Sequence, residues 1–283
     1  MRFARAEGIE GEIVVHDGVA WIVKGIAHPH GSVIAFPRYS LAPPRKLSTA
    51  EKLRLASSLS RYWRFLDIWA PILPRTAIVA KPSRDLEQLI QLLELYVPNA
   101  CRVIPTGSAA IGLPNANDLD AVVACPSSEL CRLTYEALRE MRCAGLLGES
   151  LGTLYREWLA RHRSTISFES YNALKVGSPL IGKFANTSYT LRIVNMEFKP
   201  HKVLSSMYKE MQVVILRDVL SFTTPCRYIV YAPSLGKAIL ESYRLLFTEL
   251  TPGTTVRTLF RIEYRADGVT YIIPDHSSNV EIR

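Results

Sequence analysis

The first part of the chain alternates short apolar runs with turn signals. The runs EIVV and VAWIVKGI flank the pair Asp17-Gly18, and a third run, SVIAFPRY, follows a His-Pro-His-Gly break. Asp-Gly between two such runs is a strong hairpin signal, because both residues tolerate the positive φ angles of a tight turn. Residues 12–38 are therefore predicted to form a small antiparallel sheet.

The apolar positions that follow have a helical period instead. Ser48 or Thr49 is expected to cap a helix that ends at Pro71 and Pro74. Its apolar positions are Leu53, Leu55, Leu59, Tyr62, Trp63 and Leu66.

The middle of the chain mixes both periods. Ser83 is expected to cap the helix RDLEQLIQLLELY, which stops before Pro98, and Ser127 or Ser128 is expected to cap SELCRLTYEALREM. A strand, DLDAVVAC, lies between these helices, and a further helix is predicted in LGTLYREWLARH. The strand SYTLRIVNMEF then follows and is broken by Pro200.

Beyond residue 203 the pattern predicts mostly strands: QVVILRDVL, CRYIVYA, TVRTLFRIEYR and VTYIIP. The 283 residues are therefore expected to form an α+β protein with three units. Residues 1–82 form an N-terminal β-rich unit with a helix, and residues 83–202 a central domain of mixed sheet and helices. Residues 203–283 form a C-terminal β-rich unit, for which a small barrel is one arrangement.

Composition narrows the class of protein. With 48% hydrophobic and 21% charged residues the chain resembles ordinary globular proteins and not disordered ones. Its net charge of +8 favours a polyanionic partner, because a positive field attracts phosphates. Residues 152–203 hold eight Lys or Arg and three acids, a surplus of five. Nucleic acid, RNA above all, is the expected polymeric partner.

The five cysteines are odd in number and lack C-x-x-C spacing, so neither a zinc site nor a disulfide framework is expected. We interpret the cysteines as reduced, buried thiols of a cytoplasmic protein. The start of the sequence lacks the apolar core of a signal peptide, and no run approaches the roughly 18 apolar residues of a membrane span. No membrane partner is expected.

The segment VIPTGSAAIGLPNANDLDAVV carries the strongest chemical signal. Asp118 and Asp120 stand at i and i+2 of a predicted strand, so their side chains share one face. Two neighbouring carboxylates repel unless a dication lies between them, and Mg²⁺ accepts one or two protein carboxylates together with phosphate oxygens and water. A site for Mg²⁺ or Mn²⁺ at this pair is predicted.

Nine residues separate Asp118 from a Gly-Ser turn in the same segment. Gly107 allows close approach of the backbone, and Ser108 supplies a hydroxyl and an N-H at the start of a helix, where phosphate binds readily. The alternative is that Gly-Ser is only a helix cap and that Asn-Asp-Leu-Asp is a polar turn entering a strand. The short, fixed interval between the two halves favours the functional interpretation.

These residues resemble the signature of the DNA polymerase beta-like nucleotidyltransferase superfamily: a hydrophobic residue and Gly-Ser, about ten residues, then Asp-hydrophobic-Asp. The superfamily commonly adds a third acidic residue on a later strand, and Glu197 in Met196-Glu197-Phe198 is the best match here. Glutamate at that position is less usual. The alternative for SYTLRIVNMEF is a core strand with a solvent-facing end.

The likeness extends over most of the chain. VKGIAHPHGSVIAFPRY, SFESYNALKVGSPLIGKFANTSYTLRIV, PCRYIVYA and SYR look like segments of an uncharacterised archaeal nucleotidyltransferase-domain family. That family is assigned by its nucleotidyltransferase core, so the resemblance implies a fold and says little about substrate.

The resemblance implies a magnesium-dependent transfer of NMP from an NTP to a hydroxyl acceptor. RNA, a protein or a small molecule such as an aminoglycoside could carry that hydroxyl, and the positive charge favours RNA. Lys175, Lys183 and Arg192 are the expected cations for the triphosphate, although a solvated basic face would explain them equally well. Glu197 or Asp120 would deprotonate the acceptor. The alternative function is a nucleic-acid-binding protein that keeps the fold without catalysis.

Overall fold

The computed structural model describes residues 6–76, 81–275 and 278–283. Helices and strands combine in an α+β arrangement, which confirms the predicted class. Within those described ranges, no helix is both long enough and apolar enough to cross a lipid bilayer.

The chain divides into two compact units. The first contains Met1–Trp63, Ile68–Gly148 and Lys183–Pro200, and the second contains Arg64–Asp67, Glu149–Gly182 and His201–Arg283. This division differs from the three predicted ranges, because residues 149–182 group with the C-terminal strands. The ammonium of Lys175 donates to the carbonyl of Thr248 at 2.7 Å, a contact between segments far apart in sequence.

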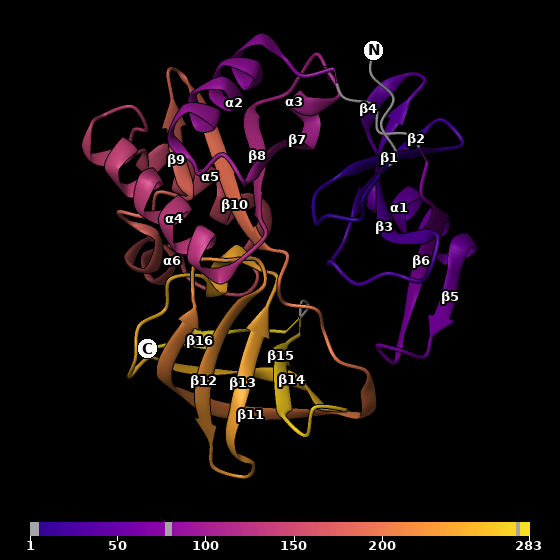
Figure 1. Ribbon diagram of the computed structural model, residues 1–283, viewed down its shortest axis with the longest axis vertical. Coiled ribbons are helices and arrows are strands. Elements are labelled where there is room, and N and C mark those ends of the chain that lie inside the picture. Colours follow the sequence, from indigo (N-terminus) through magenta and orange to yellow (C-terminus); the bar gives the residue numbers. More distant parts are fainter. Residues whose placement is uncertain (1–5, 77–80, 276–277) are drawn as a thin grey trace. The chain divides into compact units, whose positions relative to one another are not determined.

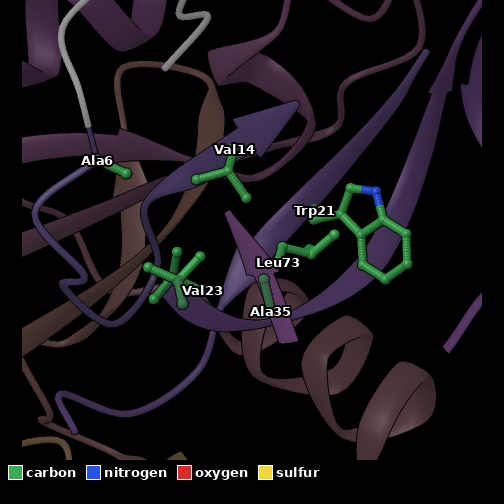
Figure 2. Close-up of a cluster of buried hydrophobic side chains, with 7 residues drawn as sticks. Ala6, Val14, Trp21, Val23, Ala35 and Leu73 are labelled. Atoms are coloured by element: carbon green, nitrogen blue, oxygen red, sulfur yellow. The ribbon is translucent and has the colours of Figure 1, made fainter. Parts of the chain in front are cut away.

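In the first unit, the N-terminal strands form a six-stranded sheet in the order β1-β2-β3-β6-β5, with β4 paired to β3. These strands are β1 (Ile13–His16), β2 (Val19–Val23), β3 (Ser32–Leu41), β4 (Pro44–Lys46), β5 (Ser60–Trp63) and β6 (Ile68–Pro74). The predicted hairpin is confirmed: β1 and β2 are antiparallel, and Asp17 and Gly18 both have positive φ angles of 48° and 70°. Figure 2 shows part of the core of this sheet, where Trp21, Val23 and Leu73 pack together.

The helix predicted from Ser48 onward is shorter than expected. Ser48 and Glu51 form a capping box at the start of α1 (Thr49–Leu59), but the helix ends there and the chain turns into the β5–β6 hairpin. Tyr62 and Trp69 face each other across this hairpin with ring centroids 5.8 Å apart. Cross-strand aromatic pairing therefore overrides the helical period that continued to Leu66.

The first unit also holds a four-stranded sheet in the order β7-β8-β10-β9. Its elements are β7 (Arg102–Thr106), β8 (Asp118–Cys125), β9 (Ile181–Phe184), β10 (Thr187–Asn195), α2 (Arg84–Tyr96), the short α3 (Gly107–Ala110) and α4 (Ser128–Cys143). Strands β8 and β10 are parallel, and β7 is antiparallel to β8 (Figure 1). Leu119 and Ala121 are buried on one face of β8, and Asp118 and Asp120 lie on the other.

A disulfide joins Cys101 to Cys125, so the prediction of reduced thiols at these positions was wrong. Arg102 pairs with Ala124 across β7 and β8, which places the two cysteines opposite each other with Cα atoms 4.4 Å apart. A separation of 24 residues matches no cysteine motif, so the sequence does not identify the two as a pair. Strand register, which the composition does not reveal, brings the thiols together.

The second unit contains a five-stranded barrel. The helices and strands of the whole second unit are α5 (Leu151–Arg161), α6 (Phe168–Lys175), β11 (Val203–Leu220), β12 (Cys226–Ala232), β13 (Gly236–Ser242), the 3-10 turn η1 (Leu245–Phe247), β14 (Thr255–Arg265), β15 (Thr270–Pro274) and β16 (Glu281–Ile282). The order β11-β12-β13-β15-β14 closes because the long β11 pairs with both β12 and β14. Strands β13 and β15 are parallel, and the other neighbours in the ring are antiparallel.

Candidate nucleotide and metal site

The two halves of the Gly-Ser and Asp-Leu-Asp motif meet in the first unit. Gly107 has a φ angle of +75°, and a Cβ atom built on it would lie 2.9 Å from both Cβ and Cγ of Asp120 and closer still to Oδ2. Only glycine fits there, because any side chain would strike the carboxylate and also strain the backbone. The glycine turn is thus in direct contact with one of the two candidate metal ligands.

Ser108 contacts the other carboxylate. Its side chain is buried, and its hydroxyl donates to Oδ1 of Asp118 at 3.3 Å. Asp118 itself is half-buried, as is Asp120. Gly107, Ser108, Asp118 and Asp120 therefore form a single cluster, and α3 begins within it as one short helical turn.

The strands on either side of β8 surround the carboxylate pair with hydroxyl groups. In register, Ser188 of β10 lies opposite Asp118, and Thr190 of β10 and Thr106 of β7 lie opposite Asp120. Residues opposite each other in neighbouring strands have side chains on the same face. The nearest positions of β10 thus carry hydroxyls and no carboxylate.

Glu197 does not join this cluster, contrary to the prediction of a third metal ligand. Strand β10 ends at Asn195, which pairs with Cys125 at the far end of β8. Asp118 and Cys125 are seven positions apart on β8, which is about 23 Å along the strand.

At that far end Glu197 caps a helix. Its carboxylate accepts from the hydroxyl of Ser128 at 2.8 Å and from the backbone N-H of the same residue at 3.0 Å. These two bonds lower the pKa of the carboxyl group below its ordinary value. The Glu197 side chain therefore fixes the start of α4.

Two of the three predicted triphosphate cations lie elsewhere. Lys175, in the second unit, is fully buried and donates to both the carbonyl and the hydroxyl of Thr248. Burial lowers the pKa of this ammonium, while Glu249 opposes that effect. Lys183 lies on β9, which is separated from β8 by β10, and its backbone pairs with Gly148. Neither residue is placed beside the carboxylate pair.

Arg192 is on the correct face but has a partner. It follows Thr190 by two positions on β10, and its guanidinium lies 3.0 Å from Oε1 of Glu10. Lys24 contacts the same oxygen at 3.0 Å. Burial raises the pKa of Glu10, but Lys24 and Arg192 outweigh that effect and leave the pKa below its ordinary value. Arg192 therefore shares the single negative charge of Glu10 with Lys24.

Tyr39 of the N-terminal sheet is a neighbour of the site that the sequence did not indicate. Its side chain is buried, which raises the pKa of the phenol. Arg38, which hydrogen-bonds the Tyr39 side chain, lowers this pKa, and the charges of Asp120 and Asp118 raise it. Strand β3 thus lies within electrostatic range of the carboxylate pair.

Arg38 and Lys46 adjoin Tyr39, and Lys52 lies close to both of these cations; we call Arg38, Lys46 and Lys52 the N-terminal basic cluster. Lys46 pairs with Tyr39 across β3 and β4. Burial lowers the pKa of Lys52, and the positive charges of Arg38 and Lys46 lower it further, so the three cations share a small region. Nothing in their spacing marks them, because strand pairing and α1 bring them together.

Lys81 is a further cation near the glycine turn. Its backbone N-H donates to the carbonyl of Ala110 at 2.7 Å, which ties it to the end of α3. Its side chain is exposed, and its Cδ atom would lie 3.9 Å from a Cβ atom built on Gly112. The backbone of Lys81 is thus held against the end of α3, the short helix that starts at the Gly-Ser turn.

The donor set fits one hard dication. Asp118 and Asp120 supply two carboxylates on one face of β8, which matches the preference of Mg²⁺ for one or two carboxylates completed by phosphate oxygens and water. Among the described residues, no group of three or more His, Cys, Asp or Glu side chains is arranged to hold a metal by itself. The phosphates of a nucleotide would have to complete the coordination.

Comparisons with known proteins show no family. No family model matches the sequence, and no curated protein matches it. A crystal structure of the tetrameric p202 HIN2 aligns with a TM-score of 0.24 and 11% sequence identity. The alignment covers 36% of this chain and 61% of that one, so it spans less than two thirds of the known protein. At this TM-score the likeness bears on neither fold nor function.

Proposed function

We propose that the first unit binds a nucleoside triphosphate with Mg²⁺ or Mn²⁺ and transfers its nucleotidyl group to a hydroxyl acceptor. The observation that carries the proposal is the contact between the two halves of the motif. Gly107 touches Asp120, and Ser108 hydrogen-bonds Asp118, although nine residues separate Ser108 from Asp118. The Gly-Ser turn, which would approach phosphate through its backbone, and the carboxylate pair, which would hold the dication, thus occupy one place.

A dication held by Asp118 and Asp120 would supply charge neutralisation for the leaving pyrophosphate. The residues of the chain orient the reactants. The acceptor oxygen attacks the α-phosphorus, the bond from that phosphorus to the oxygen bridging to the β-phosphate breaks, and pyrophosphate leaves. The acceptor proton passes to the carboxylate of Asp120, which takes the role of base now that Glu197 is distant.

The triphosphate needs cations that are not already paired with buried acids. The N-terminal basic cluster and Lys81 meet this need better than the three cations expected from the sequence. Arg38 is exposed and adjoins Tyr39. The charges of Asp118 and Asp120 affect the pKa of Tyr39, so Arg38 lies in the same electrostatic environment as these carboxylates. We assign the phosphate tail to Arg38, Lys46 and Lys52, with Lys81 beside the Gly-Ser turn.

RNA is the acceptor that the charge of the chain favours, since +8 at neutral pH attracts a polyanion. A second candidate function is nucleotide binding without transfer. The hydroxyls of Ser188 and Thr190, where a third carboxylate would complete a two-metal site, favour this candidate. Both functions require the nucleotide and the metal to bind at the same pair of carboxylates.

The test is calorimetric titration of ATP, GTP, CTP and UTP with and without Mg²⁺ into the wild-type chain and into Asp118→Asn and Asp120→Asn. We expect magnesium-dependent binding of at least one nucleotide, weakened about tenfold or more by either substitution because a charged ligand is lost. Asp17→Asn is the matched control, since Asp17 is an exposed carboxylate in a turn that accommodates asparagine. Unchanged binding in both site variants would exclude the proposed site.

Turnover separates the two candidate functions. Incubation with labelled NTP and total RNA labels the acceptor if transfer occurs. Binding that depends on Asp118 and Asp120 without labelled RNA, protein or small molecule would favour the binding function.

A further inference from the structure

The barrel of the second unit has the strand order and directions of an OB-fold. Five strands close in the order first, second, third, fifth and fourth, and only the third and fifth, β13 and β15, are parallel. In such barrels the outer face of the second and third strands is a common binding surface for single strands. Strands β12 and β13 hold these places (Figure 1).

Side-chain alternation defines which residues occupy that outer face. Tyr228, Val230 and Leu240 are fully buried and point into the barrel. The residues between them point outward and pair across the two strands. These pairs are Arg227 with Glu241, Ile229 with Ile239, and Tyr231 with Lys237, and Arg217 of β11 continues the Ile229 row. We call these seven residues the β12–β13 outer face.

The exposed part of this face is aromatic and positively charged. Tyr231 is 46% exposed, and Arg217 and Lys237 are also exposed. The one acid of the face, Glu241, is 2% exposed and is held by Arg227 at 2.6 Å and Arg265 at 2.9 Å. Its negative charge is therefore cancelled, and the charge presented to solvent is that of Arg217 and Lys237.

Buried interactions of Arg265 and Tyr271 hold the strands next to the exposed residues in place. Arg265 also contacts Glu263 at 2.8 Å, and its guanidinium lies 3.8 Å from the centre of the Tyr271 ring. Tyr271 pairs with Ile239 across β13 and β15, and its hydroxyl donates to Asp267 at 2.9 Å. A network of buried ion pairs thus fixes the strands on which Tyr231 and Lys237 stand.

We propose that the β12–β13 outer face binds single-stranded nucleic acid. Bases stack on Tyr231 and on the adjoining Ile229 and Ile239, and the backbone phosphates contact Arg217 and Lys237. Stacking accepts any base, since each has a π-face, so the recognition is sequence-tolerant. A duplex keeps its bases stacked on one another and cannot offer them to the tyrosine.

This inference stands on the barrel alone and needs neither nucleotide nor metal. Where the proposed transfer also occurs, the face supplies the polymer that carries the acceptor hydroxyl. The two ideas fail separately, because single-strand binding is measured without NTP or divalent cation.

The test is fluorescence anisotropy of the full chain with labelled 12-nucleotide oligo-U and oligo-dT and with a duplex of the same length, in the presence of EDTA. We expect both single strands to bind more tightly than the duplex. Tyr231→Ala lowers the affinity about tenfold, and Tyr231→Phe, which keeps the ring, retains it. Tyr96→Ala is the matched control, since Tyr96 is 47% exposed on α2.

Salt dependence tests the cations. The slope of log affinity against log salt falls by about 1.4 in the double variant Arg217→Ala and Lys237→Ala, at about 0.7 for each lost phosphate contact. Lys209→Ala, an exposed lysine on β11, leaves the slope unchanged. Equal affinity for duplex and single strand, or wild-type affinity and slope in the Tyr231→Ala and double variants, would overturn the proposal.

Discussion

Substitution of Gly107 by alanine separates two physical effects at the candidate site. The first is backbone strain, because an L-residue at a φ angle of +75° is in the left-handed region and costs about 1–2 kcal/mol. The second is collision with Asp120. Only the second effect moves a metal ligand, so the two must be measured apart.

The size of the collision follows from the distances. A methyl group at position 107 would lie 2.9 Å from Cβ and Cγ of Asp120, whereas carbon atoms pack best at about 3.5–4.0 Å. Asp120 must therefore retreat by about 0.6 Å or more, and its nearer carboxylate oxygen by more than that. Overpacking of this kind costs about 1–3 kcal/mol, so Gly107→Ala should lose about 2–5 kcal/mol of unfolding free energy in total.

Gly145→Ala is the control for strain alone. Gly145 has a φ angle of +74°, and a Cβ atom built on it meets nothing within 4 Å. It belongs to the same unit, in the loop after α4. Urea denaturation should show a loss of about 1–2 kcal/mol in Gly145→Ala and a clearly larger loss in Gly107→Ala.

Nucleotide binding and transfer give the functional measurement. A ligand displaced on the order of 1 Å lowers catalysis by about 100-fold, and magnesium-dependent nucleotide affinity should fall as well. Gly145→Ala should retain both. The reasoning is refuted if the two alanine variants lose equal stability and Gly107→Ala still binds the nucleotide as the wild type does.

Three further predictions concern buried groups. Glu10→Gln should lose about 3 kcal/mol, because Arg192, whose side chain is 20% exposed, and the more exposed Lys24 both lose their counter-charge, whereas the exposed Glu94→Gln should change little. The pKa of Glu10 is lowered from 4.5, so its contribution is complete above pH 4.5 and is lost as the pH falls below that value, a slope that Glu10→Gln removes from pH-dependent urea curves. Thiol titration in denaturant should count three free cysteines, and Cys101→Ser should lower stability by about 3.5 kcal/mol for a loop of this length. A count of five free thiols in the wild type would contradict the disulfide. Burial lowers the pKa of His162 to about 3, so stability should fall as the pH drops below 6.5, by up to about 1.4 kcal/mol per pH unit, and His162→Phe should abolish this fall; an unchanged slope would contradict the assignment.

Elements with strong local signals were predictable from the sequence. The strand TVRTLFRIEYR matches the bounds of β14, Thr255–Arg265, and the helix capped by Ser83 matches α2. The Asp17-Gly18 hairpin was equally clear. In each case the signal lies within a few neighbouring residues, so no knowledge of distant partners was needed.

Features that depend on distant partners were missed or misplaced. The helical period around Tyr62 gave way to pairing with Trp69, and Cys101 meets Cys125 only through the register of β7 and β8. Glu197 shows the same limit. A hydrophobic-acid-hydrophobic triplet at the end of a strand does not reveal which end of the sheet it occupies, and parallel pairing of β8 with β10 put it at the end away from Asp118.

The candidate site also combines a part that the sequence predicts locally with a part that depends on distant elements. The carboxylate pair and the Gly-Ser turn lie within one short segment, so their spacing in sequence was enough to predict that they share a face. The cations come from other elements: Arg38 from β3, Lys46 from β4 and Lys52 from α1. No sequence window contains both groups, and the cations chosen from the nearest basic stretch proved to be buried, paired or on another strand.

The charges on the sheet face explain why a dication and a polyphosphate would bind together. Asp118 and Asp120 contribute two negative charges, while Lys24 and Arg192 contribute two positive charges of which Glu10 cancels one. The face keeps a net negative charge, and the nearest hydroxyls cannot balance it. A dication alone would reverse the sign of this small region, and a triphosphate alone would meet two carboxylates. Together they leave a net negative charge, which the three positive charges of the N-terminal basic cluster can balance; these three cations raise one another's energy in the absence of an anion.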